Sequence, residues 1–125
     1  LFTTNLFYNN ALDATPSQTD DRYSITQNPQ DIGAFRAPTL RNISVSAPYM
    51  HDGRFSTLDE VLEFYNSGLQ DSPNVHPYMH KINEGGANLT PTQIADLKSF
   101  LNTLTDESFL TDEKKSNPFK QKKQK

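Results

Sequence analysis

Residue types that can bind iron or move protons are few in this sequence, and several stand together. The chain of 125 residues has three His, two Met and five Tyr, which include the adjacent pairs Met50-His51 and Met79-His80. It has no Cys and no H-E-x-x-H helix, so disulfides and thiolate metal sites are excluded and a structural or hydrolytic zinc site is disfavoured. No Ser-His-Asp arrangement, phosphate-binding Gly loop or paired catalytic carboxylate has a local signature here. Without any family resemblance, the sequence indicates a helical, acidic, cofactor-sized domain and no more specific chemistry.

The clearest element to position such a residue is a helix over the segment TLDEVLEFYNSG, from Thr57 to Gly68. Thr57 and Glu60 form a capping box at its start, and Gly68 ends it. The apolar residues of this segment recur at helical spacing, and this stripe is Leu58, Val61, Leu62 and Tyr65. The spacing predicts that the Tyr65 ring faces the core.

A second helix is expected from about Pro91 to Leu104, with Thr90 as N-cap and Gln93 completing another capping box. Its predicted apolar face is formed by Ile94, Leu97, Leu101 and Leu104, with Phe100 beside it. Residues 1–38 and 71–88 are rich in turn-forming residues, and no strand pair with a hairpin turn is found. The predicted fold class is mainly α with long loops.

Composition indicates one domain whose core is incomplete by itself. Only 34% of the residues are hydrophobic and the mean hydropathy is -0.74, so a partner domain or a large apolar cofactor is expected to complete the core. No apolar run approaches the roughly 20 residues that a membrane span needs.

The charge is unevenly distributed. Six of the twelve Lys and Arg are lysines at or after Lys114, where no acids occur, so residues 1–113 hold 6 basic and 15 acidic residues. We expect residues 1–113 to form the domain and residues 114–125 a basic, disordered tail. An acidic body argues against nucleic acid and suits a basic protein partner.

Several longer motifs carry a family resemblance. The segment GAFRAPTLRNISVSAPYMHDG, residues 33–53, and the helix that follows it resemble the C-terminal haem domain of bacterial diheme cytochrome c peroxidases. They also resemble the related enzyme that matures the tryptophan-derived cofactor of methylamine dehydrogenase. LTPTQIADLKSFLNTLTD resembles the closing helix of the cytochrome c fold, and LFTTNLFYNNALD resembles the stretch soon after the haem-attaching C-x-x-C-H. The resemblance covers residues 1 to about 119 and implies a cytochrome c-like haem domain.

The sequence departs from the family in lacking the C-x-x-C-H, and with it both thioether cysteines and the proximal histidine. The chain cannot attach haem c covalently by itself. We therefore expect a fragment that begins just downstream of the motif and is inactive alone.

For the intact parent, the resemblance implies a periplasmic cytochrome-c peroxidase that reduces hydrogen peroxide to water. Electrons would come from a small cytochrome or cupredoxin, and a homodimer is allowed. Peroxide would react in the N-terminal haem domain, while this domain would house the electron-accepting second haem, so no catalytic residue is expected in this chain. The alternatives are a haem-free helical protein-binding module, which would explain the missing cysteines, and a stand-alone monohaem electron carrier.

The resemblance also assigns the sixth ligand of the second haem. The position fourteen residues after the histidine of the HDG turn holds Met in the well-known peroxidases and Tyr in the maturation enzyme, and here it falls on Tyr65. Met50, Met79 and His80 are chemically competent alternatives. The other reading of Tyr65 is a core tyrosine that donates a hydrogen bond to a backbone carbonyl.

Further site residues follow from the same resemblance. His51 is expected near the haem edge, although a polar HDG turn needs no cofactor to be stable. Arg36 and Arg41 are suitable partners for haem propionates, or alternatively for nearby acids. The backbone carbonyls of Ser46 and Pro48 are expected to bind a structural Ca²⁺ at the boundary between the two haem domains.

Overall fold

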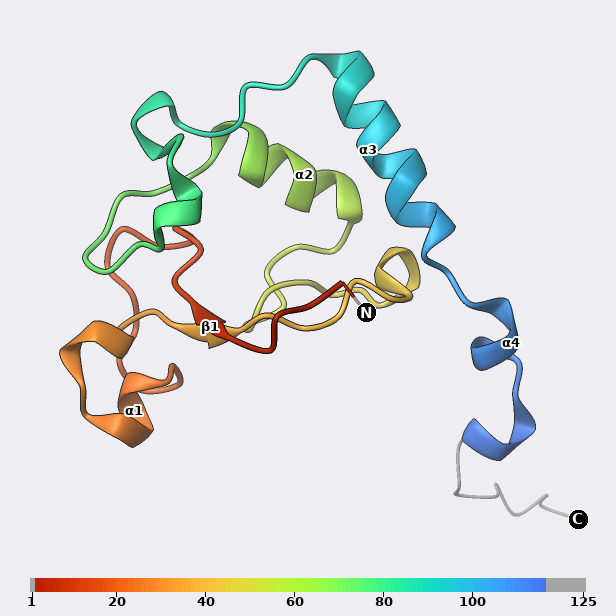
Figure 1. Ribbon diagram of the computed structural model, residues 1–125, viewed down its shortest axis with the longest axis horizontal. Helices are drawn as coiled ribbons and strands as arrows, with labels where there is room; N and C mark the ends of the chain where they lie inside the picture. Colours follow the sequence, from red (N-terminus) through yellow and green to blue (C-terminus); the bar gives the residue numbers. More distant parts are fainter. Residues whose placement is uncertain (1, 117–125) are drawn as a thin grey trace, which may run out of the picture.

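The computed structural model describes residues 2–116, and helices are its main regular structure (Figure 1). The helices are α1 (Tyr23–Thr26), α2 (Leu58–Ser67), α3 (Pro91–Thr103) and α4 (Glu107–Leu110), and the strands are β1 (Phe7–Tyr8) and β2 (Phe35–Arg36). Short 3-10 turns lie in the loops: η1 (Pro29–Asp31), η2 (Ile43–Val45), η3 (Pro77–Met79), η4 (Ile82–Glu84) and η5 (Glu113–Lys115). In Figure 1, α3 lies beside α2, and α4 leads away toward the C-terminus. The expected fold class, mainly α with long loops, is confirmed in part, because the chain also forms a small β pair.

The β pair joins two segments that are distant in the sequence. Phe7 is the antiparallel partner of Arg36, and Tyr8 is the partner of Phe35. The Ala37 N–H also donates to the Leu6 carbonyl at 3.0 Å. These residues are not joined by a hairpin turn, so no local turn signal could reveal the pair. The pairing fixes the N-terminal segment against the stretch that leads to the HDG turn.

Helix α2 has the start that the sequence predicts. The Thr57 hydroxyl accepts from the Glu60 N–H at 3.2 Å, and the Glu60 carboxylate accepts from the Thr57 N–H at 2.9 Å. This capping box satisfies N–H groups that have no partner within the first turn. At the other end, the Gly68 N–H donates to the Phe64 carbonyl at 2.8 Å. The buried residues of α2 are Leu58, Val61, Leu62 and Phe64.

Helix α3 is capped as expected but buries a narrower face than its pattern indicates. Leu101 is buried, and Ile94 and Leu104 pack against the core. Leu97 is 37% exposed and Phe100 is 47% exposed, so part of the predicted apolar face is left uncovered. Helix α3 packs mainly against α2 and η2.

The hydrophobic core is small. Its buried cluster consists of Tyr49, Leu58, Val61, Leu62 and Leu101. Within residues 2–116 no large side chain is completely buried, while many large apolar ones are exposed, including Phe2, Phe100 and Leu110. A low apolar content therefore yields a thin core with uncovered apolar surface around it.

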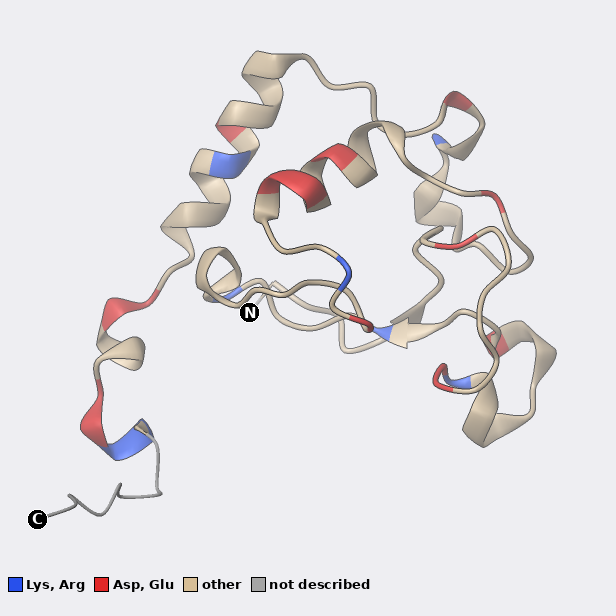
Figure 2. Ribbon diagram, turned by 180° about the vertical axis from the view of Figure 1, so that it is seen from behind, with Lys and Arg blue, Asp and Glu red and all other residues tan. Residues whose placement is uncertain are grey.

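The 3-10 turn η5 includes Lys114 and Lys115, the first two residues of the expected basic tail. The other basic residues of this tail lie outside the described residues, so the disorder of the tail stays a prediction. Acidic residues outnumber basic ones along the described chain (Figure 2). Among the residues that the structure describes, no helix has both the length and the apolar character needed to cross a membrane.

Candidate functional site

Tyr65 lies near the C-terminal end of α2, with its side chain turned toward the core. Its ring meets Phe64 edge-on, with 4.9 Å between the ring centroids. The phenol oxygen accepts a hydrogen bond from the Asn10 Nδ2 amide at 3.0 Å. Burial raises the pKa of Tyr65, and the hydrogen bond from Asn10 acts in the opposite direction. The partner of this phenol is thus a side-chain donor, and not the carbonyl that an ordinary core tyrosine would use.

Met50 approaches the same amide. Its Sδ atom lies 3.7 Å from Asn10 Nδ2, and the side chain packs against the hydrophobic core. Tyr65 belongs to α2 and Met50 to the turn before it, so the fold brings two possible iron ligands to one amide group. Sulfur and phenol oxygen are both donors found on the axial positions of haem iron.

His51 lies on the other side of Asn10. Its imidazole stacks on the Phe35 ring, with 3.8 Å between centroids and 13° between planes, and is only 19% exposed. Its Nε2 atom is 3.7 Å from an Asp20 carboxylate oxygen. Stacking and a nearby carboxylate hold the ring in place without any cofactor.

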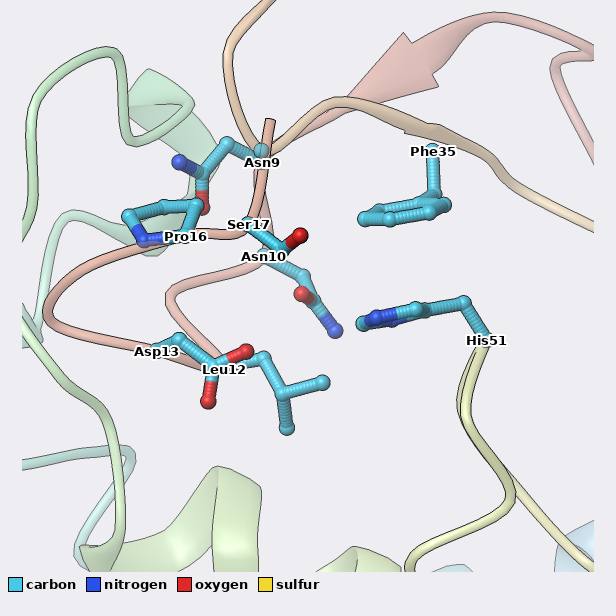
Figure 3. A pocket seen from close by; sticks show the side chains of 9 residues that line it. Asn9, Asn10, Leu12, Asp13, Pro16, Ser17, Phe35 and His51 are labelled. Atoms are coloured by element: carbon cyan, nitrogen blue, oxygen red, sulfur yellow. The ribbon is translucent and has the colours of Figure 1, made fainter. Parts of the chain in front are cut away.

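A small pocket separates His51 from the N-terminal segment (Figure 3). Its lining residues are Asn9, Asn10, Leu12, Asp13, Pro16, Ser17, Gly33, Phe35 and His51. Figure 3 shows the Asn10 amide pointing toward the edge of the His51 ring. The free space is about 10 Å³, which is room for about one water molecule. This pocket suits a water and cannot take a macrocycle.

Arg54 fixes the HDG turn to the N-terminal segment. Its guanidinium donates to both carboxylate oxygens of Asp13, at 2.7 and 3.1 Å, and its Nε donates to Asp52 at 2.7 Å. The hydrogen bond from Arg54 holds the pKa of Asp52 below its usual range, and the bonds to Asp52 and Asp13 raise the pKa of Arg54. Both His51 and Met50 belong to this turn, so the clamp positions the site.

The two arginines expected at haem propionates use other partners. Arg36 is exposed on β2 and donates to the Asn5 side chain at 3.1 Å. Arg41 pairs with the Asp106 carboxylate and lies over the Phe109 ring, 5.1 Å from its centroid. Their role toward propionates stays a prediction.

The remaining candidate ligands lie in loops. Met79 closes η3, and its N–H donates to the His76 carbonyl at 2.8 Å, while His80 is exposed directly after it. Ser46 and Pro48 are both exposed in the turn before Tyr49. Across residues 2–116, no group of three or more His, Cys, Asp or Glu side chains could hold a metal ion. A Ca²⁺ site here would therefore depend on backbone carbonyls and on ligands from elsewhere.

Sequence reasoning missed Asn10, Phe35, Arg54 and Asp13 as parts of this site. Asn10 lies 55 positions from Tyr65, and Arg54 lies 41 positions from Asp13. Asn10, Asp13 and Phe35 lie in segments that carry the family resemblance, and Arg54 directly follows one of these segments.

Tyr65 and Met50 are the residues of this cluster that would hold a haem iron. Their phenol oxygen and thioether sulfur meet at the edge of a thin apolar core, and both are atom types that bind haem iron, which would supply electron transfer when bound. The cysteines that would attach haem c are not in this chain, which has no Cys. Residues outside the chain would have to supply them.

No family model matches the chain. The curated proteins to which it is similar are cytochrome-c peroxidases and MauG proteins. It is 40% identical over 83 residues to the cytochrome-c peroxidase IdrP1 of Denitromonas iodatirespirans, which covers 66% of the chain and 21% of that protein. It is 33% identical over 94 residues to the methylamine utilization protein MauG of Methylorubrum extorquens, covering 75% of the chain and 22% of that protein.

The solved structures give a similar result. A MauG-like protein associated with microbial copper homeostasis matches with a TM-score of 0.75 and 36% identity, over 90% of the chain and 38% of that protein. The chain thus spans only about a fifth of the length of these two curated relatives.

Proposed function

Because the chain belongs to the family of bacterial diheme cytochrome c peroxidases and MauG proteins, we propose that it is the second haem domain of such an enzyme. The parent would reduce hydrogen peroxide in the periplasm, taking up two electrons and two protons to give two water molecules. Peroxide would react in the N-terminal haem domain, and this domain would accept the electrons and pass them on.

The observation that carries this proposal is the meeting of Tyr65 and Met50 at the Asn10 amide. Of these two donors, Tyr65 is the proposed sixth ligand. A phenolate is a hard anionic donor that favours ferric iron, so its haem would have a lower potential than one with methionine ligation. Haem c, when bound, would store and transfer single electrons.

The residues of the chain would set the surroundings of that cofactor. Helix α2 carries Tyr65, and the Leu58, Val61 and Leu62 side chains keep water from its inner face. The Arg54 clamp holds the turn with His51 beside the site. The protein would thereby control ligation and burial, while the redox chemistry belongs to the cofactor.

The partners follow from charge and from uncovered apolar surface. Fifteen acidic residues within 1–113 would attract a basic face on a small cytochrome or cupredoxin, which raises the association rate at low salt. The N-terminal haem domain of the parent would cover exposed apolar residues of the body. Between the two domains, the Ser46 and Pro48 carbonyls would contribute to a Ca²⁺ site.

The experiment that tests this proposal is made on the parent protein, produced in a host that attaches haem c. Covalent haem per polypeptide is counted, and peroxide consumption is measured with a reduced small redox protein as donor. We expect two covalent haems in the parent and, after residues 1–125 are deleted, loss of the low-spin signal of the second haem and of peroxide turnover. The covalent count itself does not decide, because the attaching cysteines lie outside this chain. A parent with a single haem, or a second-haem signal and turnover that survive the deletion, would refute the proposal and favour the haem-free binding module.

A further inference from the structure

Asn10 is placed to act on both candidate ligands at once. Its Nδ2 group lies 3.0 Å from the Tyr65 phenol oxygen and 3.7 Å from the Met50 sulfur. A side-chain amide nitrogen carries two N–H donors, so one can serve each atom. The three side chains come from three separate segments, and the amide is their common contact.

The position of Asn10 is fixed by its neighbours. Asn9 is 4% exposed, its carbonyl accepts from the His76 N–H at 3.0 Å, and its side chain donates to Ser72 Oγ and to the Pro73 carbonyl, both at 3.3 Å. On the other side, the buried Ala11 accepts through its carbonyl from the Gln70 N–H at 2.8 Å. The segment that carries the amide is thus attached to the loop after α2, and the amide is held in place before any ligand binds.

The two hydrogen bonds respond differently to iron. A phenol oxygen that loses its proton gains charge, and an N–H bond to a charged oxygen is shorter and stronger than one to a neutral acceptor. A thioether sulfur is a weak acceptor and stays neutral. The Asn10 amide therefore stabilises the Tyr65 oxygen as an iron ligand much more than the Met50 sulfur. Its contact with the sulfur also occupies one of the sulfur lone pairs, which is then not free to bind iron.

We propose that Asn10 is a positioning residue that selects the Tyr65 oxygen over the Met50 sulfur as the sixth ligand of the second haem. This rests on the proposed function, because it requires a haem at this site. A hydrogen bond to a charged group changes such an equilibrium by about tenfold to a hundredfold. Without the amide, the fraction of molecules with methionine ligation should rise by that factor.

The test uses Asn10→Leu and Asn10→Asp in the haem-loaded parent. Asn10→Leu removes both donors, and Asn10→Asp keeps the shape while placing a carboxylate against the phenol oxygen. Ligation is read from electron paramagnetic resonance, from the near-infrared band of methionine-bound haem and from the reduction potential. We expect methionine ligation and a higher potential in both variants, and loss of the methionine signal in Asn10→Leu combined with Met50→Leu.

Two controls separate the possible failures. If Tyr65→Phe leaves the wild-type signal unchanged, Tyr65 is not the ligand and the proposed ligation fails at once. If Tyr65→Phe abolishes that signal while both Asn10 variants keep the wild-type ligand and potential, only the role of Asn10 is refuted. In the haem-free chain, the side-chain amide resonances of Asn10 should shift in Tyr65→Phe and in Met50→Leu, and unchanged resonances in both would contradict the geometry on which the inference depends.

Discussion

Replacement of Gly86 by Ala should strongly destabilise the chain, because the backbone of α2 lies against this glycine. A Cβ atom at Gly86 would lie 2.3 Å from the Asn66 carbonyl oxygen, 2.4 Å from the Asn66 carbonyl carbon and 2.7 Å from the Ser67 nitrogen. All three are backbone atoms, so no change of side-chain rotamer relieves the contact. The loop must move away from the end of the helix that carries Tyr65.

The cost of that movement can be estimated from the bonds it breaks. The Ala87 N–H donates to the Tyr65 carbonyl and the Asn88 N–H to the Asn66 carbonyl, both at 3.0 Å, and the Leu89 N–H donates to the Asn66 side chain at 2.6 Å. Each contributes about 1 kcal/mol net, so the loss of all three costs roughly 3 kcal/mol. At about 4 °C per kcal/mol, Tm should fall by about 12 °C.

The assay is unfolding of the chain by urea and by heat, followed by far-UV circular dichroism. The matched control is Gly85→Ala, because a Cβ at Gly85 meets only the Ser67 carbonyl oxygen at 3.6 Å, an ordinary contact. Its left-handed φ of 82° still costs about 1 kcal/mol for a residue with a side chain. If Gly86→Ala is no less stable than Gly85→Ala, the reasoning from backbone contact is refuted.

Three further predictions concern the helix start, pH and calcium. Thr57→Ala removes the N-cap of α2 and should lower the free energy of unfolding by about 1 kcal/mol in urea; an unchanged midpoint would contradict the capping role. Hydrogen bonds from Ser108, the Phe109 N–H and Arg41 lower the pKa of Asp106 in the folded chain below its ordinary 3.8. The ionised carboxylate therefore stabilises the folded chain fully when the pH is above the ordinary pKa, and this stabilisation is lost as the pH falls through the lowered pKa. The difference in urea midpoint between wild type and Asp106→Asn should therefore be full at neutral pH and shrink in acid, and a constant difference would refute the assignment. Calorimetry should detect no tight Ca²⁺ binding by this chain, because its turn supplies only part of a coordination sphere, and strong binding would mean that the site is built differently.

The local signals in the sequence were reliable. Both long helices begin at the predicted N-caps, Thr57 and Thr90, because a capping box is a contact between residues three positions apart. The inward position of Tyr65 follows from the same helical spacing. Periodicity could not show that Leu97 is 37% exposed, since an apolar stripe does not reveal how much of it a neighbour covers.

Contacts between distant segments could not be predicted from the sequence alone. The amide of Asn10 reaches Tyr65 across 55 positions, and nothing in the local pattern around either residue requires the other. The same holds for Arg54 and Asp13, whose pairing depends on how the N-terminal loop wraps around the HDG turn. Such contacts arise only after the loops are placed by the β pair and the core.

The most direct test of the central claim is the spectrum of the second haem after Tyr65→Phe in the intact parent. The matched control is Tyr49→Phe, a buried tyrosine of the same core whose phenol donates to the Ile43 carbonyl at 2.7 Å. We expect Tyr65→Phe to remove the wild-type, phenolate-ligated signal of the second haem, with methionine ligation in its place, and to raise its reduction potential, while Tyr49→Phe leaves both unchanged. An unaltered low-spin signal in Tyr65→Phe would contradict the account and direct attention to Met50, Met79 or His80.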